Sequence, residues 1–144
     1  MKKEFLPQVK VIIVEDDDFY NKFLYLSIDN KLRELSLLYS FKYSLLSFHH
    51  FEDCKTNFDN DIDIVFTDYF LKSGYKATHA INLVKSKSPR CKVVVLSQVR
   101  NMQTSVNTIL DGAYDFIKKD LNTLPECYTL LKNVIGEKLS YKNQ

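Results

Sequence analysis

The sequence contains little glycine and proline, with three residues of each among 144, and it contains no tryptophan. Gly74, Gly112 and Gly136 lie too far apart to form a GxGxxG fingerprint or a P-loop, which excludes the common glycine-rich nucleotide-binding motifs. No Pro/Gly/Ser-rich stretch, repeat or second zone of composition divides the chain. We therefore expect one domain over residues 1–144, with a core from about residue 8 to 140 and no attached output domain.

Cysteine is also scarce, and its three residues, Cys54, Cys91 and Cys127, form no CxxC pair. An odd number of widely spaced cysteines argues against a disulfide framework and against a zinc site, so we expect reduced thiols. No apolar run approaches the roughly 20 residues of a membrane span, and residues 1–14 lack the long apolar region and cleavage site of a signal peptide. We expect a cytoplasmic protein without membrane insertion.

Charge of one sign is not in excess either. The 20 Lys and Arg residues and the 18 Asp and Glu residues are interspersed and give a net charge of +2. Such a chain has no basic stripe of the kind that phosphate backbones require, so we expect no direct binding of nucleic acid. Hydrophobic residues make up 45% and charged residues 26%, which is typical of a folded globular domain.

Four short apolar runs are rich in Val, Ile and Phe and continuous rather than alternating, which is typical of strands buried on both faces of a parallel sheet. They cover residues 9–14, 62–67, 92–96 and 114–118. Between them, apolar residues recur with the helical period, as Ala77, Ala80, Ile81 and Val84 and then as Met102, Val106, Ile109 and Leu110. Strands that alternate with helices predict an α/β fold with a doubly wound parallel sheet.

The remaining segments complete the pattern. We expect Asp18 to cap a first helix over residues 19–35, followed by a strand over residues 41–48 and a second helix. The last helix carries a capping signature, Thr123 with Glu126 three residues later, and is expected to run to about residue 140. The result is five strands and five helices, and ligands of such sheets bind outside the carboxyl ends of the strands.

Charged residues stand just after the apolar runs. Glu15 and Asp16 follow one run, Asp68 a second and Lys119 a third. Because parallel strands end at one edge of their sheet, these side chains are expected to meet there. Two unit charges roughly 4 Å apart interact by about 4 kcal/mol at an effective dielectric of about 20, so gathered carboxylates repel one another. A divalent cation and Lys119 would relieve that repulsion.

Together with Ser97, these residues form an ordered set of four motifs: VIIVEDDD with Glu15 and Asp16, DIVFTDYFL with Asp68, VVVLSQ with Ser97, and GAYDFIKK with Lys119. Over nearly the whole chain, this set resembles the receiver domains of two-component response regulators, in their single-domain, chemotaxis-regulator-like form. Each motif alone is weak, but their order and spacing are specific. The resemblance implies a flavodoxin-like three-layer sandwich with a five-stranded parallel sheet in the order 2-1-3-4-5.

The resemblance also implies a role for each matching residue. Asp68 would be the phospho-acceptor, and Asp68 and Asp16 would bind Mg²⁺ directly. Glu15 would act on the metal through water, and the backbone carbonyl of Phe70 would complete the protein's share. Mg²⁺ suits this set because it takes few carboxylates and keeps several waters, and Mn²⁺ is the alternative ion. Lys119 would pair with Asp68 or with the phosphoryl group.

Two further matches would form the switch. Ser97 would hydrogen-bond a phosphoryl oxygen, and Phe116 would then turn inward behind it. In GAYDFIKK the matching lysine is Lys119 rather than Lys118, because the aromatic of the family pattern precedes the lysine by three residues. Strand alternation agrees, since it places residues 117 and 119 on one face and residue 118 on the other.

The implied function is a signalling switch rather than a conventional enzyme. A sensor histidine kinase or a phosphotransfer protein would donate a phosphoryl group to Asp68. The surface of the fourth helix, fifth strand and fifth helix would then change and bind an unknown downstream protein or a second copy of the chain. Autodephosphorylation would be slow, because Phe70 and Val99 match positions that flank the path of the hydrolytic water.

Departures from the family pattern motivate an alternative. Lys72 and Lys76 stand where the loop after the acceptor usually carries a proline and a glycine, and Asp120 stands where a proline usually follows the lysine. A degenerate receiver that binds its partner without phosphorylation is the alternative function. An aspartyl-phosphate phosphatase is disfavoured, because Phe70 stands where one such pattern has a second aspartate.

Overall fold

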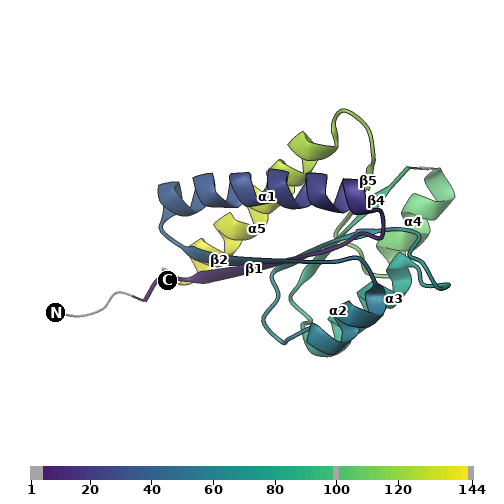
Figure 1. Cartoon of the computed structure of the whole chain (residues 1–144). Helices are drawn as coiled ribbons and strands as arrows, with labels where there is room; N and C mark the ends of the chain where they lie inside the picture. The colour runs from purple at the N-terminus through teal and green to yellow at the C-terminus, as the bar shows by residue number, and fades with distance from the viewer. Residues whose placement is uncertain (1–4, 99–100, 143–144) are drawn as a thin grey trace.

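The computed structural model describes residues 5–98 and 101–142, and strands alternate with helices along this part of the chain (Figure 1). The strands are β1 (Gln8–Val14), β2 (Lys42–Phe48), β3 (Ile64–Asp68), β4 (Lys92–Ser97) and β5 (Asp115–Lys118). The helices are α1 (Asp18–Tyr39), α2 (Phe51–Asn57), α3 (Ala77–Lys87), α4 (Met102–Leu110) and α5 (Thr123–Lys142). The strands form one parallel sheet in the order β2-β1-β3-β4-β5, which confirms the predicted fold and strand order.

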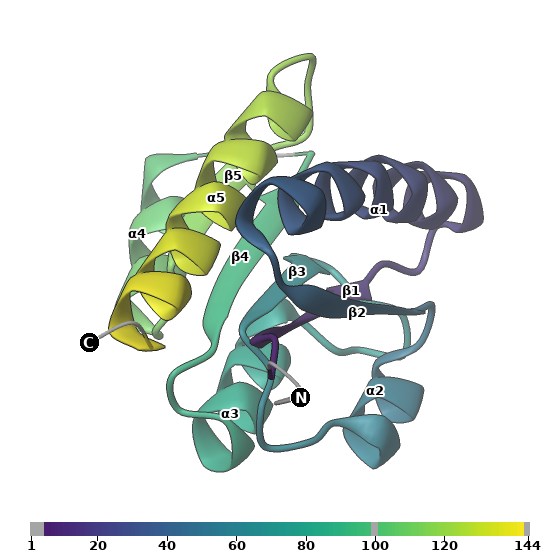
Figure 2. The same ribbon diagram turned by 90° about the vertical axis from the view of Figure 1, so that its left-hand side faces the viewer.

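Two hydrophobic cores lie on opposite faces of the sheet. α1 and α5 cover one face, while α2 and α3 pack on the other (Figure 2). Strand alternation divides the residues of β1 between them: Val11 and Ile13 enter the core under α1 and α5, and Ile12 and Val14 enter the other. The apolar runs of the sequence are therefore continuous because both faces of the sheet are covered.

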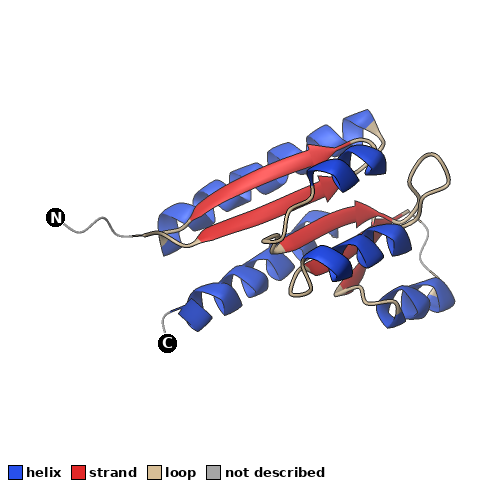
Figure 3. Ribbon diagram, turned by 90° about the horizontal axis from the view of Figure 1, so that it is seen from below, coloured by secondary structure: helices blue, strands red, loops and turns tan. Residues whose placement is uncertain are grey.

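All strands of the sheet run in the same direction, so their carboxyl ends lie along one edge (Figure 3). The register fixes how far each strand reaches. Val14 at the end of β1 lies opposite Thr67, so Asp68 extends just beyond β1, and Ser97 at the end of β4 lies opposite Lys118. The residues that follow these ends are therefore placed at one edge of the sheet.

α1 begins one residue earlier and ends later than predicted. Asp17, rather than Asp18, is the N-cap, because its side chain accepts a hydrogen bond from the backbone N–H of Tyr20 at 2.8 Å. The helix has 22 residues and ends where Ser40 adopts a left-handed conformation with a φ of 55°. The last buried leucine of the helical period is Leu35, which is why the sequence pattern placed the end there.

α4 is present where predicted, but its apolar residues do not face the core. The helix has one buried residue, Thr108, whose hydroxyl donates to the carbonyl of Thr104 at 2.7 Å. The residues that carried the helical period are exposed: Met102, Val106, Ile109 and Leu110. The periodicity therefore predicted the helix correctly, but the apolar side that it marked lies at the surface instead of in the core.

The start of α5 differs from the predicted capping box. Thr123 is the first residue of the helix, and its hydroxyl accepts from the backbone N–H of Asp120 at 2.7 Å and donates to the carbonyl of Lys118 at 2.9 Å. This side chain closes the turn after β5 instead of pairing with Glu126. The predicted core residues of α5 are buried: Cys127, Leu131, Val134 and Ile135.

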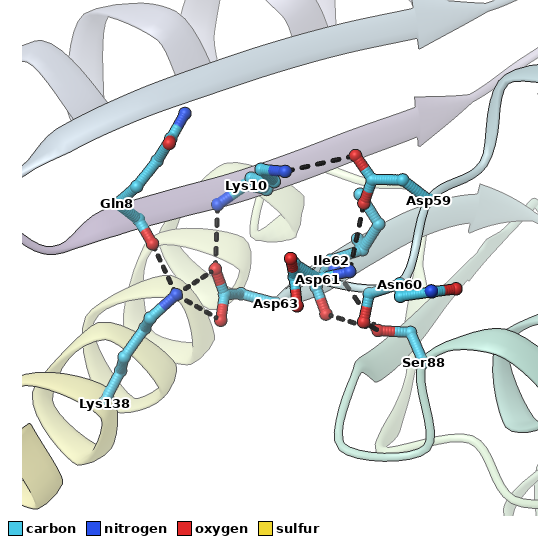
Figure 4. A network of polar contacts seen from close by, with 9 residues as sticks. All are labelled: Gln8, Lys10, Asp59, Asn60, Asp61, Ile62, Asp63, Ser88 and Lys138. Carbon is cyan, nitrogen blue, oxygen red and sulfur yellow. Dashed lines mark hydrogen bonds and ion pairs between the residues drawn. The ribbon is translucent and has the colours of Figure 1, made fainter.

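A network of polar contacts joins α5 to the opposite, amino-terminal edge of the sheet (Figure 4). The ammonium of Lys138 lies 2.9 Å from both carboxylate oxygens of Asp63, and it also contacts the carbonyl of Gln8. Asp63 accepts a second hydrogen bond from the backbone N–H of Lys10 at 2.8 Å. Lys138 thus anchors the carboxyl-terminal half of α5 beneath β1 and β3.

The cysteines agree with the expectation of reduced thiols. Cys54, Cys91 and Cys127 are free and buried. Burial raises the pKa of Cys54 and of Cys127 to about 12, so these thiols remain protonated at neutral pH. Among the helices of the described residues, none is long and apolar enough to cross a membrane.

Candidate functional site

The predicted charged residues meet at the carboxyl edge of the sheet. Glu15 and Asp16 follow β1, Asp68 ends β3 and Lys119 follows β5. Glu15, Asp16 and Asp68 each offer a carboxylate oxygen, and these oxygens lie within 4.8 Å of one another. Residues separated by more than a hundred positions in the sequence are thus brought into one cluster by the strand order.

Lys119 neutralises part of this cluster. Its ammonium lies 2.8 Å from Oε1 of Glu15 and 3.4 Å from Oδ1 of Asp68, and its side chain is 8% exposed. Lys118, by contrast, is exposed, so the lysine that lies at the site is Lys119, as predicted from the sequence. The prediction paired Lys119 with Asp68, whereas the shorter contact is the one to Glu15.

Glu15 is the most deeply buried member of the cluster, at 1% exposure. Its backbone N–H donates to the carbonyl of Phe48 at 3.0 Å, which ties the residue to the end of β2. Within the described part of the chain, its Oε2 atom is buried and has no hydrogen-bond partner. A buried carboxylate oxygen without a partner is costly, and a bound cation or its water would satisfy it.

The charge balance also favours a cation. Three carboxylates and one ammonium leave two excess negative charges when all are ionised, which one divalent ion balances. Burial raises the pKa of Glu15 to about 7, with Lys119 opposing the shift. Burial also raises the pKa of Asp68, again opposed by Lys119. Burial is the main cause of both shifts, and the neighbouring carboxylates add to them.

These observations fit Mg²⁺ or Mn²⁺, the ions expected from the sequence. The ligand set is carboxylate oxygen throughout, and Asp16 and Asp68 are only partly buried, which leaves room for the waters that Mg²⁺ retains. The cluster therefore could hold a divalent ion, although the individual ligand roles remain predictions.

The cluster opens into a cavity of about 410 Å³ at the carboxyl edge. The cavity is lined by side chains and backbone of β-strand ends and of the start of α1: Glu15, Asp17, Phe19, Tyr20, Asp68, Phe70, Ser97, Gln98 and Lys119. Phe70, whose carbonyl was predicted as a metal ligand, is thus at the cavity wall. That carbonyl's role as a ligand remains a prediction.

The loop after Asp68 turns without the proline and glycine of the family pattern. Phe70 and Lys76 form an isolated antiparallel bridge, and between them Ser73 and Gly74 have φ values of 65° and 80°. Glycine adopts such a conformation without strain, so Gly74 provides the turn of this loop, in which Lys72 and Lys76 replace the usual proline and glycine. None of the peptide bonds in the described residues is cis, including the one between Lys119 and Asp120.

Ser97 and Phe116, the predicted switch residues, are both 3% exposed. The carbonyl of Ser97 accepts a hydrogen bond from the backbone N–H of Lys119 at 2.8 Å, which joins the ends of β4 and β5. The ring of Phe116 lies inside, with its centroid 6.1 Å from that of Tyr69. The aromatic is therefore already turned inward in this structure, and its movement remains a prediction. Val99 lies outside the described residues.

Two residues of α1 complete the site and were not predicted. The buried side-chain amide of Asn21 donates to the carbonyl of Glu15 at 2.9 Å and to that of Phe48 at 3.3 Å. Tyr20 places its ring against Lys119, with 4.3 Å between the ammonium and the ring centroid. Both follow from the N-cap at Asp17, which fixes which residues of the first turn face the strand ends and which the sequence did not distinguish from Asp18.

No protein-family model and no curated protein matches the sequence. Solved structures do match. A response regulator receiver domain protein from Clostridium thermocellum has a TM-score of 0.71 at 16% identity, over 90% of this chain and 96% of that one. The beryllofluoride-activated NtrC4 receiver domain dimer has a TM-score of 0.70 at 19% identity, over 89% and 97%.

A third structure is a response regulator from Burkholderia pseudomallei with a phosphorylated aspartic acid, a calcium ion and citrate; its TM-score is 0.63 at 15% identity, over 92% of this chain and 72% of that one. The fold and the acidic cluster define a doubly wound α/β domain with a charged site at the carboxyl edge of its sheet. More particularly, the chain has the fold of response regulator receiver domains. At these identities the likeness concerns the fold, so the function rests on the site.

Proposed function

We propose that the protein is a phosphorylation-controlled signalling switch, in which Asp68 accepts a phosphoryl group from the phosphohistidine of a sensor kinase or phosphotransfer protein. The observation that carries the proposal is the position of Asp68: it shares a partly buried site with two further carboxylates and with the ammonium of Lys119, 3.4 Å away. In the transfer, an oxygen of Asp68 forms the new P–O bond while the P–N bond of the donor breaks.

The other residues of the site support this transfer through charge. Glu15, Asp16, Asp68 and the carbonyl of Phe70 would hold Mg²⁺, or Mn²⁺ in its place. The ion, when bound, supplies positive charge to the phosphoryl oxygens. Lys119 neutralises a further oxygen, and the hydroxyl of Ser97 donates a hydrogen bond to the group. The protein thus catalyses its own phosphorylation and slow dephosphorylation but turns over no separate substrate.

The output surface of the proposed switch comprises α4, β5 and α5. Val106, Ile109 and Leu110 of α4 are exposed, at 49%, 43% and 77%, and they line a small apolar cavity of about 260 Å³ next to Phe116. An exposed apolar helix face of this kind marks an interaction site. A downstream protein or a second copy of the chain would cover it when Asp68 is phosphorylated. The free, buried thiols suit a reducing compartment, and we place the switch in the cytoplasm.

The test is incubation with acetyl phosphate and Mg²⁺, followed by intact-mass measurement. The expected result is one phosphoryl group on the wild type, which hydroxylamine removes as it removes an acyl phosphate, and none on Asp68→Asn. Asp61→Asn, an exposed aspartate at the opposite edge of the sheet, is the matched control and should be phosphorylated like the wild type. Equal incorporation into wild type and Asp68→Asn would contradict the proposal.

The same variants distinguish the proposed switch from the alternative function, a degenerate receiver. A degenerate receiver would bind its partner equally in the wild type and in Asp68→Asn, with or without phosphate donor. The proposed switch instead predicts that Asp68→Asn loses the phosphate-dependent part of binding. Ile109→Lys should lose binding in either case, because it places a charge in the apolar face of α4.

A further inference from the structure

The ring of Tyr20 forms one wall of the site and lies directly against its lysine. The ammonium of Lys119 is 4.3 Å from the centroid of this ring, well within the distance at which a cation is attracted to an aromatic face. Lys119 is nearly buried, so water screens this attraction little. The ammonium therefore has three partners: the carboxylates of Glu15 and Asp68, and the ring.

The local structure holds the ring in this place. Tyr20 stands in the first turn of α1, and its backbone N–H is fixed by the N-cap side chain of Asp17 at 2.8 Å. Its ring also packs against Phe23, with 5.8 Å between the centroids. Burial raises the pKa of Tyr20 to about 12, so the side chain is neutral at working pH and offers an uncharged ring face.

The three partners of Lys119 differ in what else they can bind. Glu15 and Asp68 are the carboxylates that would also hold a divalent ion, and a carboxylate that binds an ion attracts an ammonium less strongly. The face of an aromatic ring attracts the ammonium without competing for a hard, hydrated ion such as Mg²⁺. Tyr20 is thus the partner that Lys119 keeps when the carboxylates are engaged by the metal.

We propose that Tyr20 is a positioning residue for Lys119: its ring face holds the ammonium at the site when Glu15 and Asp68 bind Mg²⁺, and so keeps it ready for an oxygen of the phosphoryl group. This inference rests on the proposed function. Through Tyr20, α1 would contribute to binding of the phosphoryl group by keeping Lys119 in place. This role requires the ring of Tyr20 but not its hydroxyl.

The experiment compares the wild type with Tyr20→Leu and Tyr20→Phe. Tyr20→Leu removes the ring and keeps a helix-forming apolar side chain, whereas Tyr20→Phe keeps the ring. Tyr39→Leu makes the same change at the exposed end of the same helix and is the matched control. For each protein, NMR titrations measure the affinity for Mg²⁺ alone and the affinity for beryllofluoride at saturating Mg²⁺.

We expect Tyr20→Leu to weaken beryllofluoride binding by about fivefold to thirtyfold, the effect of losing one desolvated cation–ring contact, and to leave Mg²⁺ affinity unchanged. Tyr20→Phe and Tyr39→Leu should match the wild type in both titrations. Unchanged beryllofluoride affinity in Tyr20→Leu, an equal loss for Mg²⁺, or an equal loss in Tyr20→Phe would overturn the inference. Failure of the wild type to bind beryllofluoride would instead overturn the proposed function, and the inference with it.

A second measurement uses the wild type alone and does not depend on how well a variant folds. A ring face 4.3 Å from the ammonium shifts the NMR signals of the Lys119 ε-methylene protons upfield. We expect this upfield shift to persist when Mg²⁺ saturates the site. Its disappearance on addition of Mg²⁺ would show that the ring does not retain the ammonium and would overturn the inference even where beryllofluoride still binds.

Discussion

Replacement of Glu15 by glutamine should change how the stability of the metal-free protein depends on pH. Glu15 is buried beside Asp68, and its Oε1 atom accepts a hydrogen bond from the ammonium of Lys119 at 2.8 Å. Glutamine has nearly the same shape and can still accept that hydrogen bond, but it does not ionise. Glu15→Gln therefore removes the titration of one buried carboxyl while it preserves the packing around it.

The expected magnitude follows from the pKa of Glu15. Burial raises it from 4.5 to about 7, so between these pH values the folded protein holds a proton that the unfolded chain has released. The free energy of unfolding must then fall as the pH rises through this window. The difference between the two pKa values corresponds to a loss of about 3 kcal/mol, complete somewhat above pH 7. The raised pKa of Asp68 acts in the same direction.

Urea denaturation followed by far-ultraviolet circular dichroism, with a chelator present, measures this effect. From about pH 4 to about pH 8, the wild type should lose about 3 kcal/mol more than Glu15→Gln does. Glu137→Gln, at an exposed position of α5, should behave like the wild type. The reasoning is refuted if Glu15→Gln keeps the slope of the wild type, or if the metal-free wild type becomes more stable as the pH rises through this range.

Three further outcomes follow from the structure. Mg²⁺ at about a hundredfold above its dissociation constant should stabilise the wild type near pH 8 by about 3 kcal/mol in thermal or urea unfolding, and Asp16→Asn should lose this gain. The acyl phosphate of the wild type should last for minutes or longer when it is followed by intact mass. Phe70→Ala should shorten this lifetime several-fold, because the ring would no longer shield the acyl phosphate from water. An equal lifetime in the two proteins would exclude such shielding. Lys138→Met should cost about 1.5–3 kcal/mol in urea, because it removes both contacts to Asp63, whereas Lys132→Met on the exposed side of α5 should cost little.

The charged site could be predicted because it depends mainly on strand order. The apolar runs fixed where β1, β3 and β5 end, and parallel strands bring Glu15, Asp68 and Lys119 to one edge whatever their separation in the sequence. The family pattern, in which the aromatic precedes the lysine by three residues, distinguished Lys119 from Lys118, and strand alternation agreed with that choice. The prediction of these site residues holds even when the predicted bounds of the strands are wrong by one or two residues.

Tyr20 and Asn21 could not be predicted, because their contacts depend on the phase of α1. Asp17 and Asp18 are equally good caps in sequence, and only the structure shows that Asp17 receives the N–H of Tyr20. A shift of one residue turns the first helical turn by about 100° and would aim other side chains at the strand ends. The contact of Tyr20 with Lys119 could therefore not be predicted from the sequence.

The apolar side of α4 could not be assigned for a different reason. A helical period shows that a helix has one apolar face, but it does not show whether that face meets the core or a partner. In the structure Ile109 is 43% exposed and Leu110 is 77% exposed, while the buried residue of the helix is Thr108. A polar residue whose hydroxyl is hydrogen-bonded to a carbonyl of its own helix can be buried, and no periodicity rule anticipates this.

The most direct measurement is a two-dimensional NMR titration of the protein with beryllofluoride in the presence of Mg²⁺. The proposed switch predicts that the signals of Asp68, Ser97 and Lys119 shift at millimolar or lower concentrations, and that those of α4 and β5 follow them. Asp68→Asn should show none of these changes. The absence of any shift in the wild type at millimolar beryllofluoride, or the same shifts in Asp68→Asn, would contradict the assignment of Asp68 as the phospho-acceptor.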